Sequence, residues 1–150
     1  QQQMINQGRL LRNGNSYKFA ANTELKIEDF TFSNRGSLYA ASSENPWFSV
    51  FANQKWFYEL VAQRWQEAVE AKVFDNAITM IDVYTEKYED AFNRNFTKWK
   101  ESMGIKLDGY QPNLVSYFVN QKQASSYLKY WLQTRISYLE NGINQKLNSF

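Results

Sequence analysis

Residues 53–69 read NQKWFYELVAQRWQEAV, and their apolar side chains recur at spacings of three and four. This period predicts an amphipathic helix that buries one face. Asn53 can cap the first turn, because its side-chain oxygen can accept a hydrogen bond from a free backbone N–H group. The side chains predicted to lie on the buried face are Trp56, Phe57, Leu60, Val61, Trp65, Ala68 and Val69.

Two later stretches keep the same period and predict two further helices. The earlier one begins at a capping residue, Asp75, and ends near Gly104, whereas Gly142 weakens the last turns of the later one. Residues 102–122 lie between them and are predicted to form a structured loop with a short strand at 114–119. The predicted buried positions are Ile78, Ile81, Tyr84, Tyr88, Ala91, Phe92, Phe96 and Trp99 in the earlier helix, and Leu128, Trp131, Leu132, Ile136, Leu139, Ile143 and Leu147 in the later one.

The composition changes near Asn45-Pro46, where short apolar groups among Asn, Gly and Ser give way to the helical stretches. Before this point, residues 16–19 and 24–27 flank Asn22-Thr23, which predicts a hairpin followed by a loop at 33–37. We therefore predict a mainly α chain, a three-helix bundle with a small N-terminal β-hairpin. Residues 1–45 form the hairpin and loop segment, and residues 46–150 form the helical subdomain.

Composition excludes several classes of site. The chain has 150 residues, 43% of them hydrophobic, which is enough for one core. Neither Cys nor His occurs, so thiolate nucleophiles, imidazole metal ligands and His-based triads are excluded. The net charge is only +2 with no basic stripe, and no apolar run is long enough for a membrane span. We therefore expect neither a nucleic-acid partner nor a transmembrane helix.

Three segments together resemble the C-terminal region of the CotH family of secreted and spore-coat protein kinases. The first contains Trp47-Phe48, Trp56-Phe57 and Arg64-Trp65, and the second is Ala91–Trp99, similar to the family's Ala-x-x-Arg-Asn-Phe-x-Arg-Trp with Lys98 for an arginine. The third, Tyr127–Glu140, is similar to Leu-Lys-x-Trp-Leu-x-x-Arg-Ile-x-Trp-Leu-Asp, with Tyr138 and Glu140 as conservative departures. The resemblance covers residues 47–147. Its motif residues are Arg64, Trp65, Arg94, Asn95, Trp99, Trp131 and Arg135.

The resemblance implies ATP-dependent phosphoryl transfer to proteins, with a divalent metal and an atypical kinase-like fold. The family's metal-binding Asp-Phe-Asp motif precedes the helical region, and Asp29-Phe30-Thr31 could align with it, which makes Asp29 a candidate metal ligand and replaces the second carboxylate by Thr31. No glycine-rich phosphate loop is present in the sequence. We therefore expect this chain to be inactive alone and to hold no cofactor. ATP and metal would be bound by an upstream catalytic portion of a longer protein. We expect that protein to lie at the cell or spore surface or outside the cell.

Simpler structural roles compete with each of these assignments. An acidic residue such as Asp29 is often a turn or cap residue. Arg64 and Arg94 could contact phosphates or a substrate acid, but arginines close to aromatic residues on such helices commonly stack on rings or bridge helices. Trp56, Trp65, Trp99 and Trp131 lie on stripes predicted to form the core. Trp47, outside the helical period, could instead form a binding surface for protein or glycan together with Tyr39. A noncatalytic binding module is therefore the alternative to a supporting subdomain of a kinase.

Overall fold

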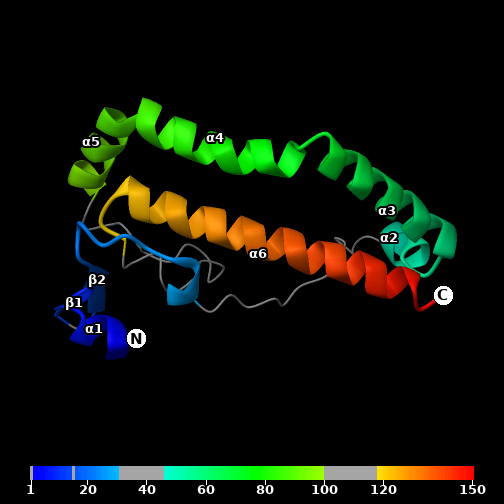
Figure 1. Ribbon diagram of the computed structural model, residues 1–150, viewed down its shortest axis with the longest axis horizontal. Coiled ribbons are helices and arrows are strands. Elements are labelled where there is room, and N and C mark those ends of the chain that lie inside the picture. The colour runs from blue at the N-terminus through cyan, green and yellow to red at the C-terminus, as the bar shows by residue number, and fades with distance from the viewer. Residues whose placement is uncertain (1, 15, 31–45, 100–117) are drawn as a thin grey trace. The chain divides into compact units, whose positions relative to one another are not determined.

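The computed structural model describes residues 2–14, 16–30, 46–99 and 118–150 (Figure 1). The prediction of a mainly helical chain with a small N-terminal hairpin is confirmed. None of the described helices combines the length and the apolar character that a membrane span requires. The elements in chain order are α1 (Gln2–Asn6), β1 (Leu10–Asn13), β2 (Ser16–Phe19), the short 3-10 helix η1 (Ile27–Asp29), α2 (Pro46–Phe51), α3 (Lys55–Glu70), α4 (Val73–Lys87), α5 (Glu89–Trp99) and α6 (Gln121–Leu147).

The chain divides into two compact units. The first unit comprises Gln1–Phe30 and Met80–Lys129, and the second comprises Thr31–Thr79 and Tyr130–Phe150. Helices α4 and α6 each contribute residues to both units. The predicted segments 1–45 and 46–150 follow the change in composition rather than this division, and they stay a prediction.

The hairpin pairs β1 with β2, with Leu10 opposite Phe19 and Asn13 opposite Ser16. The predicted pairing of residues 16–19 with residues 24–27 is therefore wrong, although its first strand is correct. The two residues between the strands are Gly14-Asn15 in the sequence, a dipeptide typical of two-residue hairpin turns, and Gly14 has a φ of 58° that glycine adopts without a Cβ clash. The residues of the turn thus favour a partner strand that precedes β2 in the sequence rather than one that follows it.

The core of the first unit is a cluster of four aromatic rings, which we call the four-ring cluster. It contains Phe19 from β2, Tyr127 from α6, Phe30, which follows η1, and Phe118, which precedes α6. Phe19 stacks on Phe118 with centroids 5.9 Å apart and meets Phe30 edge-on at 6.4 Å. Tyr127 closes the cluster, 5.1 Å from Phe30 and 5.4 Å from Phe118. Burial in this apolar setting raises the pKa of the Tyr127 hydroxyl.

Side-chain hydrogen bonds fix the start of α6. The Asn120 Oδ1 atom accepts the Gln123 backbone N–H at 3.0 Å, and the Gln123 Oε1 atom accepts the Val119 backbone N–H at 3.0 Å. This reciprocal arrangement has the logic of a capping box. Gln123 Nε2 also donates to the Ala20 carbonyl at 2.8 Å, and Asn120 Nδ2 to the Ala21 carbonyl at 2.9 Å. Polar bonds rather than apolar period therefore start the helix at Gln121, earlier than predicted, and it continues through Gly142 to Leu147.

The second predicted helix is divided into α4 and α5. Backbone hydrogen bonds continue through the junction, from Tyr88 N–H to the Tyr84 carbonyl at 3.1 Å and from Phe92 N–H to the Tyr88 carbonyl at 3.0 Å. Lys87 ends α4, whereas acidic residues occupy the first turn of α5. Each charge suits the dipole of its own helix, which favours two helices over one. Asp75 lies in the first turn of α4 rather than at a cap. The predicted end near Gly104 and residues 114–117 of the predicted strand lie outside the described residues, and the described residues 118 and 119 are not in a strand.

The first predicted helix, α3, starts later than expected. Gln54 occupies the cap position without a side-chain hydrogen bond, so the prediction that Asn53 caps α3 is wrong. The Asn53 backbone N–H instead donates to the Val50 carbonyl at 3.3 Å, at the end of α2. The short helix α2 was not predicted, although Pro46 suits a first helical position because proline lacks the N–H that such a position leaves free.

The second unit buries a different set of side chains. Tyr58 on α3 and Ile143 on α6 are almost fully buried, as is Ala52. The Tyr58 ring lies 5.9 Å from the Phe150 ring, and Lys146 Nζ lies 4.8 Å from the centroid of that same Phe150 ring. The aromatic contact thus holds Phe150 against α3, and the cation–π attraction holds it against α6.

Several positions predicted to be core are exposed. Helical period identifies side chains that share a face, but it does not provide a surface that covers the face. The hypothesis that the tryptophans turn inward is therefore wrong for Trp56, Trp99 and Trp131. The predicted core residues that are exposed are Trp56, Leu60, Val69, Tyr84, Tyr88, Ala91, Trp99, Leu128 and Trp131.

Lys72, at the end of α3, offers a test of backbone strain. Its φ of 55° lies in the left-handed region. This conformation is unfavourable for a residue with a Cβ atom, whereas glycine adopts it without that penalty. We expect Lys72→Gly to raise the free energy of unfolding by about 0.5–1 kcal/mol in urea titrations. The neighbouring Ala71→Gly, at φ −75°, should lower it by a similar amount, and equal effects of the two substitutions would contradict the assignment.

Candidate functional site

Asp29, the candidate metal ligand, is held in an ion pair at the end of η1. Arg9 donates through Nη1 to Asp29 Oδ1 at 2.8 Å and through Nη2 to Oδ2 at 2.5 Å. The Lys26 backbone N–H adds a third bond to Oδ2 at 2.8 Å, which closes the turn. Only 8% of the Asp29 side chain is exposed. The contacts therefore match the competing role of a turn residue, and the metal assignment stays a prediction.

These contacts also set the charge state of Asp29. Burial would raise the pKa of the carboxyl group, but the hydrogen bonds from Arg9 and Lys26 and the nearby positive charges together lower it below its usual range. The same pair raises the pKa of the Arg9 guanidinium, chiefly through its bond to Asp29. Asp29 is therefore ionised and paired at neutral pH. Arg9 was missed in the sequence, because nothing in the spacing links residues twenty positions apart.

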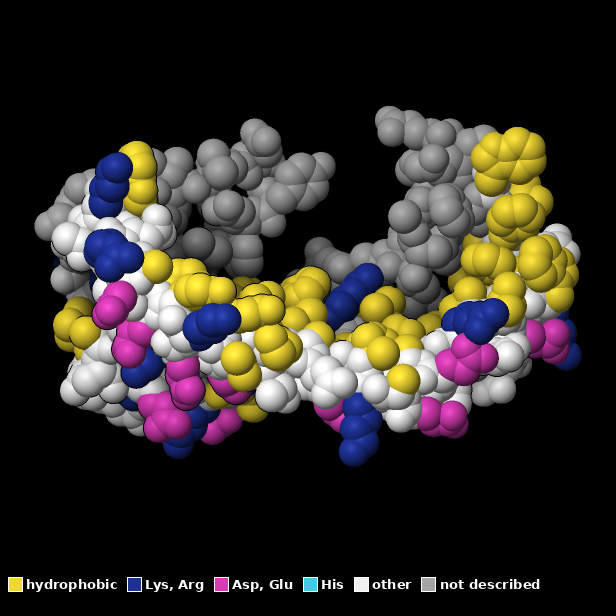
Figure 2. Space-filling model, turned by 90° about the horizontal axis from the view of Figure 1, so that it is seen from above, with side chains coloured by type: hydrophobic (Ala, Val, Ile, Leu, Met, Phe, Trp, Pro, Cys, Tyr) yellow, Lys and Arg dark blue, Asp and Glu magenta, His cyan; other side chains and the backbone are white. Residues whose placement is uncertain are grey.

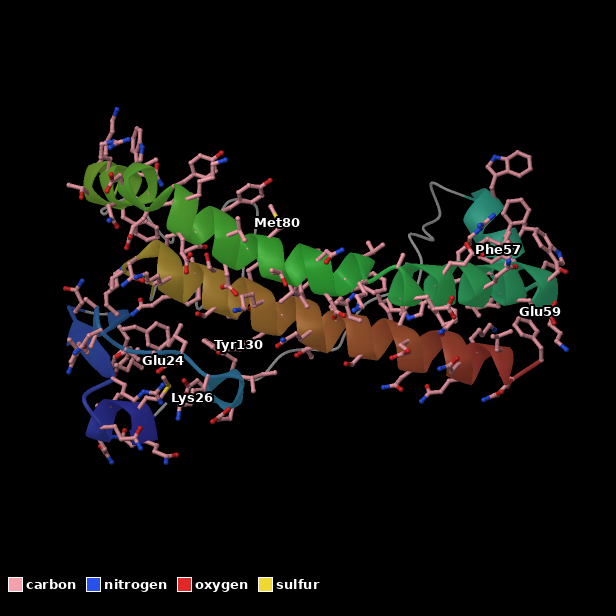
Figure 3. All side chains as sticks on the ribbon, turned by 45° about the horizontal axis from the view of Figure 1, so that its top comes forward. Glu24, Lys26, Phe57, Glu59, Met80 and Tyr130 are labelled. Carbon is pink, nitrogen blue, oxygen red and sulfur yellow. The ribbon has the colours of Figure 1, made fainter. Side chains whose placement is uncertain are left out.

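A polar pocket of about 520 Å³ lies in the first unit, beside residues 21–25. Three carboxylates line it, from Glu24, Asp82 and Glu86, and Figure 3 shows Glu24 on the segment that follows the hairpin. Its buried hydroxyl groups are bonded to each other, since Thr85 Oγ1 and Ser125 Oγ lie 2.6 Å apart. Within the described ranges, no group of three or more acidic side chains is arranged to hold a metal ion. The buried hydroxyl groups that line the pocket therefore form a polar contact between α4 and α6.

Trp47 lies in an exposed group of apolar side chains on α2 and α3, which we call the aromatic patch: Trp47, Val50, Phe51, Trp56 and Phe57. The side chain of Trp47 is 73% exposed and that of Trp56 is 53% exposed. Phe51 packs against Trp56 at 5.7 Å and against Phe57 at 5.9 Å, so the rings support one another. Figure 2 shows hydrophobic side chains gathered at the end where α2 and α3 lie, and Figure 3 labels Phe57 there. Tyr39, its predicted companion, lies outside the described residues.

Two of the motif arginines, Arg64 and Arg135, make local contacts. Arg64 Nη1 pairs with Glu67 Oε2 at 2.6 Å within α3, and both side chains are exposed. Arg64 is thus paired with an acidic residue one turn away on the same helix, and its predicted stacking or bridging role stays a prediction. Arg94 is exposed on α5 together with Asn95. Arg135 lies on α6 with its guanidinium 5.0 Å from the Tyr138 ring centroid.

Trp65 is the motif tryptophan that packs as predicted. Its indole ring lies 4.7 Å from the Phe74 ring at a tilt of 35°. The Nε1 atom is buried and has no hydrogen-bond partner in the part of the chain that the structure describes. A buried N–H donor without a partner loses its hydrogen bond to water on folding, so this indole N–H group lowers the free energy of unfolding. Trp99 and Trp131 by contrast expose their rings, and Lys98 Nζ lies 5.1 Å from the Trp99 centroid.

Comparisons with known proteins identify no relative of this chain, so any assignment of function depends on its own residues. The exposed tryptophans and the motif arginines come from helices α2, α3, α5 and α6, and the paired Asp29 precedes them in the chain. No protein-family model matches the chain, and no curated protein or solved structure is significantly similar to it.

Proposed function

We propose that this chain is the helical C-terminal portion of a CotH-like protein kinase and that it supports the catalytic portion of that enzyme. The three segments that resemble the family fall on α2–α3, α5 and α6, in the family's order. In this proposal the complete protein transfers the terminal phosphoryl group of ATP to a hydroxyl group of a protein substrate. Secretion or display at the cell or spore surface follows from the same resemblance.

The resemblance was expected to hold only if the indole rings of its three segments turn inward, and the exposed rings depart from that expectation. The supporting role therefore depends on one observation: each matched segment has an exposed tryptophan that another surface could cover. Trp56, Trp99 and Trp131 all present large apolar rings to solvent. Tryptophan is enriched at the buried centres of protein interfaces, where it contributes much of the binding energy. Surfaces of the catalytic portion would cover each of these rings and gain the free energy of removing it from water.

Phosphoryl transfer itself is assigned to the rest of the enzyme. Metal ions that neutralise the transferred phosphate are held in kinases by carboxylate and amide oxygens. Both oxygens of Asp29 already accept hydrogen bonds from Arg9 or Lys26, and residue 31, where a second carboxylate would stand, is threonine. These features support the placement of ATP and metal on residues outside this chain.

A comparison of the complete reading frame with residues 1–150 tests the proposal. We expect the protein of the full reading frame to transfer labelled phosphate from ATP to casein with magnesium or manganese, and residues 1–150 alone to show no ATP binding by calorimetry. Replacing Trp56, Trp99 and Trp131 together by alanine should lower the melting temperature of the full protein. The same triple variant of residues 1–150 should melt almost unchanged, because exposed side chains contribute little. Absence of transfer by the full protein, or metal-dependent ATP binding by residues 1–150, would overturn the proposal.

A second candidate function is favoured by the aromatic patch. Trp47 is the most exposed of the tryptophans, and it lies beside the exposed Val50 near the start of α2. Such a surface suits a noncatalytic module that binds protein or glycan, since aromatic rings offer apolar area with a polar edge. Titration with soluble cello- and chito-oligosaccharides, followed by tryptophan fluorescence, separates the candidates. A saturable change that Trp47→Ala abolishes, in a protein without phosphoryl transfer, would favour the binding module.

A further inference from the structure

Two of the carboxylates that line the polar pocket, those of Glu24 and Glu86, have no ion-pair partner among the residues that the structure describes. The third lining carboxylate belongs to Asp82 and is neutralised by Lys129, whose Nζ atom lies 3.0 Å from Oδ1 and 2.8 Å from Oδ2. Every residue that lines the pocket belongs to the first unit, so these groups share one site. The site thus keeps two carboxylates that can each accept a further cation.

The lining residues of the pocket include fewer cations than carboxylates. Lys122 is the only lysine or arginine that lines it in the described part of the chain, and its Nζ atom already lies 3.4 Å from Oε1 of Glu89, outside the pocket. Lys26 and Lys87 follow the two unpaired glutamates closely in the sequence, but neither lines the pocket. Lys26, labelled in Figure 3, lines a neighbouring pocket that Glu24 shares. Three carboxylates against one ammonium group leave the lining residues with an excess of negative charge.

The hydroxyl groups of the pocket offer acceptors rather than donors to a ligand. Because Thr85 donates its single hydroxyl hydrogen to a carbonyl oxygen at 2.7 Å, Ser125 must be the donor in the 2.6 Å bond between the two hydroxyl groups. These two side chains are buried, with 8% of Thr85 and 4% of Ser125 exposed. Each hydroxyl oxygen of the pocket thus keeps a lone pair that can accept a hydrogen bond. The four lining hydroxyl groups and the groups to which they donate are Thr23 to the Arg9 carbonyl, Thr85 to the Ile81 carbonyl, Ser125 to Thr85 Oγ1 and Ser126 to the Lys122 carbonyl.

The lining groups suit an extended organic cation rather than a single metal ion. Within the described ranges, no three acidic side chains are grouped so that they could hold one metal ion. The pocket volume of about 520 Å³ lies within the range of small-molecule sites, about 300–1,000 Å³. We propose that the pocket binds a linear aliphatic polyamine, with one ammonium group at Glu24 and another at Glu86. Its N–H groups donate to the hydroxyl oxygens, and its methylene groups lie against the side chain of Leu25, which also lines the pocket. This inference does not depend on the kinase assignment.

Titration of residues 1–150 with spermidine, followed by calorimetry at neutral pH and low ionic strength, tests the proposal. We expect saturable binding that Glu24→Gln/Glu86→Gln weakens about tenfold, because both charged contacts of the ligand are lost. The substitutions keep the size of both side chains and remove only their charge. Butylamine should bind several-fold more weakly than spermidine, because a single ammonium group can reach only one of the two carboxylates.

The matched control is Glu28→Gln/Asp90→Asn, which removes two negative charges from the same unit at residues that do not line the pocket. This variant should bind spermidine as the unmodified chain does. Circular dichroism should show the same helix content for both double variants, since all four side chains are exposed. Equal loss of binding in the two double variants would show that only the overall charge attracts the ligand and would overturn the proposal. The absence of saturable binding, or tighter binding of oligolysine than of spermidine, which would assign the site to a basic protein segment, would overturn it as well.

Discussion

Replacement of Phe19 by alanine is expected to lower the free energy of unfolding of the first unit by about 3–5 kcal/mol. The ring is 3% exposed and contacts two other members of the four-ring cluster, Phe118 and Phe30. Its removal leaves a cavity that the stacked Phe118 ring cannot fill without giving up its contact with Tyr127. The loss should be measured from urea unfolding followed by circular dichroism.

The matched control is Leu11→Ala on the neighbouring strand of the same hairpin. Leu11 is 50% exposed, whereas the preceding Leu10 lies opposite Phe19 in the core. The control should change stability by no more than about 0.5 kcal/mol, because a half-exposed side chain loses little contact on truncation. A similar loss for Phe19→Ala and Leu11→Ala would show that the four-ring cluster is not the core of the unit.

The helices were predictable from the sequence, but the coverage of their faces was not. Trp56 and Trp65 both belong to the stripe predicted on α3, at positions that local period treats alike. Trp65 meets Phe74 at 4.7 Å, whereas the Trp56 ring is 53% exposed. The difference depends on which residues the fold brings beside each ring. Period gives the side of a helix on which a residue lies and says nothing of its neighbours.

The hairpin shows a signal that the sequence contained but the prediction did not use. Gly14-Asn15 is a strong turn signal, and it separates the strands that pair, β1 and β2. Asn22-Thr23 lacks glycine, so it is a weaker candidate for a tight turn. The true pairing could therefore have been chosen from turn chemistry alone.

The contacts that position the candidate site could not be read from spacing. Gln123 bonds to the Ala20 carbonyl across 103 positions, and Arg9 bonds to Asp29 across 20. Such pairs depend on the three-dimensional path of the chain rather than on any local pattern. The sequence did identify Asp29 as a residue of interest and Trp47 as the best exposed aromatic candidate. The partner of Asp29 and the exposure of Trp56, Trp99 and Trp131 required the structure.

Replacement of Asp29 by asparagine should cost about 2–3 kcal/mol of stability at pH 7, because Arg9 loses two charge-assisted hydrogen bonds in a partly buried setting. The pKa of Asp29 is lowered in the folded state, so the unfolded chain takes up the proton more readily. The contribution of the carboxylate is therefore complete above the ordinary pKa of aspartate, about 3.9, and is lost as the pH falls further. Urea titrations at pH 7 and at pH 3 should show a difference between unmodified chain and variant that shrinks at the lower pH.

The neighbouring Glu28→Gln removes the same charge from an exposed side chain and should alter stability by no more than about 0.5 kcal/mol. The loss in Asp29→Asn should also be the same in EDTA and in excess magnesium, because the carboxylate acts through Arg9 and the backbone of Lys26. A loss that is constant between pH 7 and pH 3 would contradict the ion-pair assignment. A loss seen only with magnesium would instead restore Asp29 as a metal ligand, since a bound ion stabilises the folded state in proportion to its occupancy.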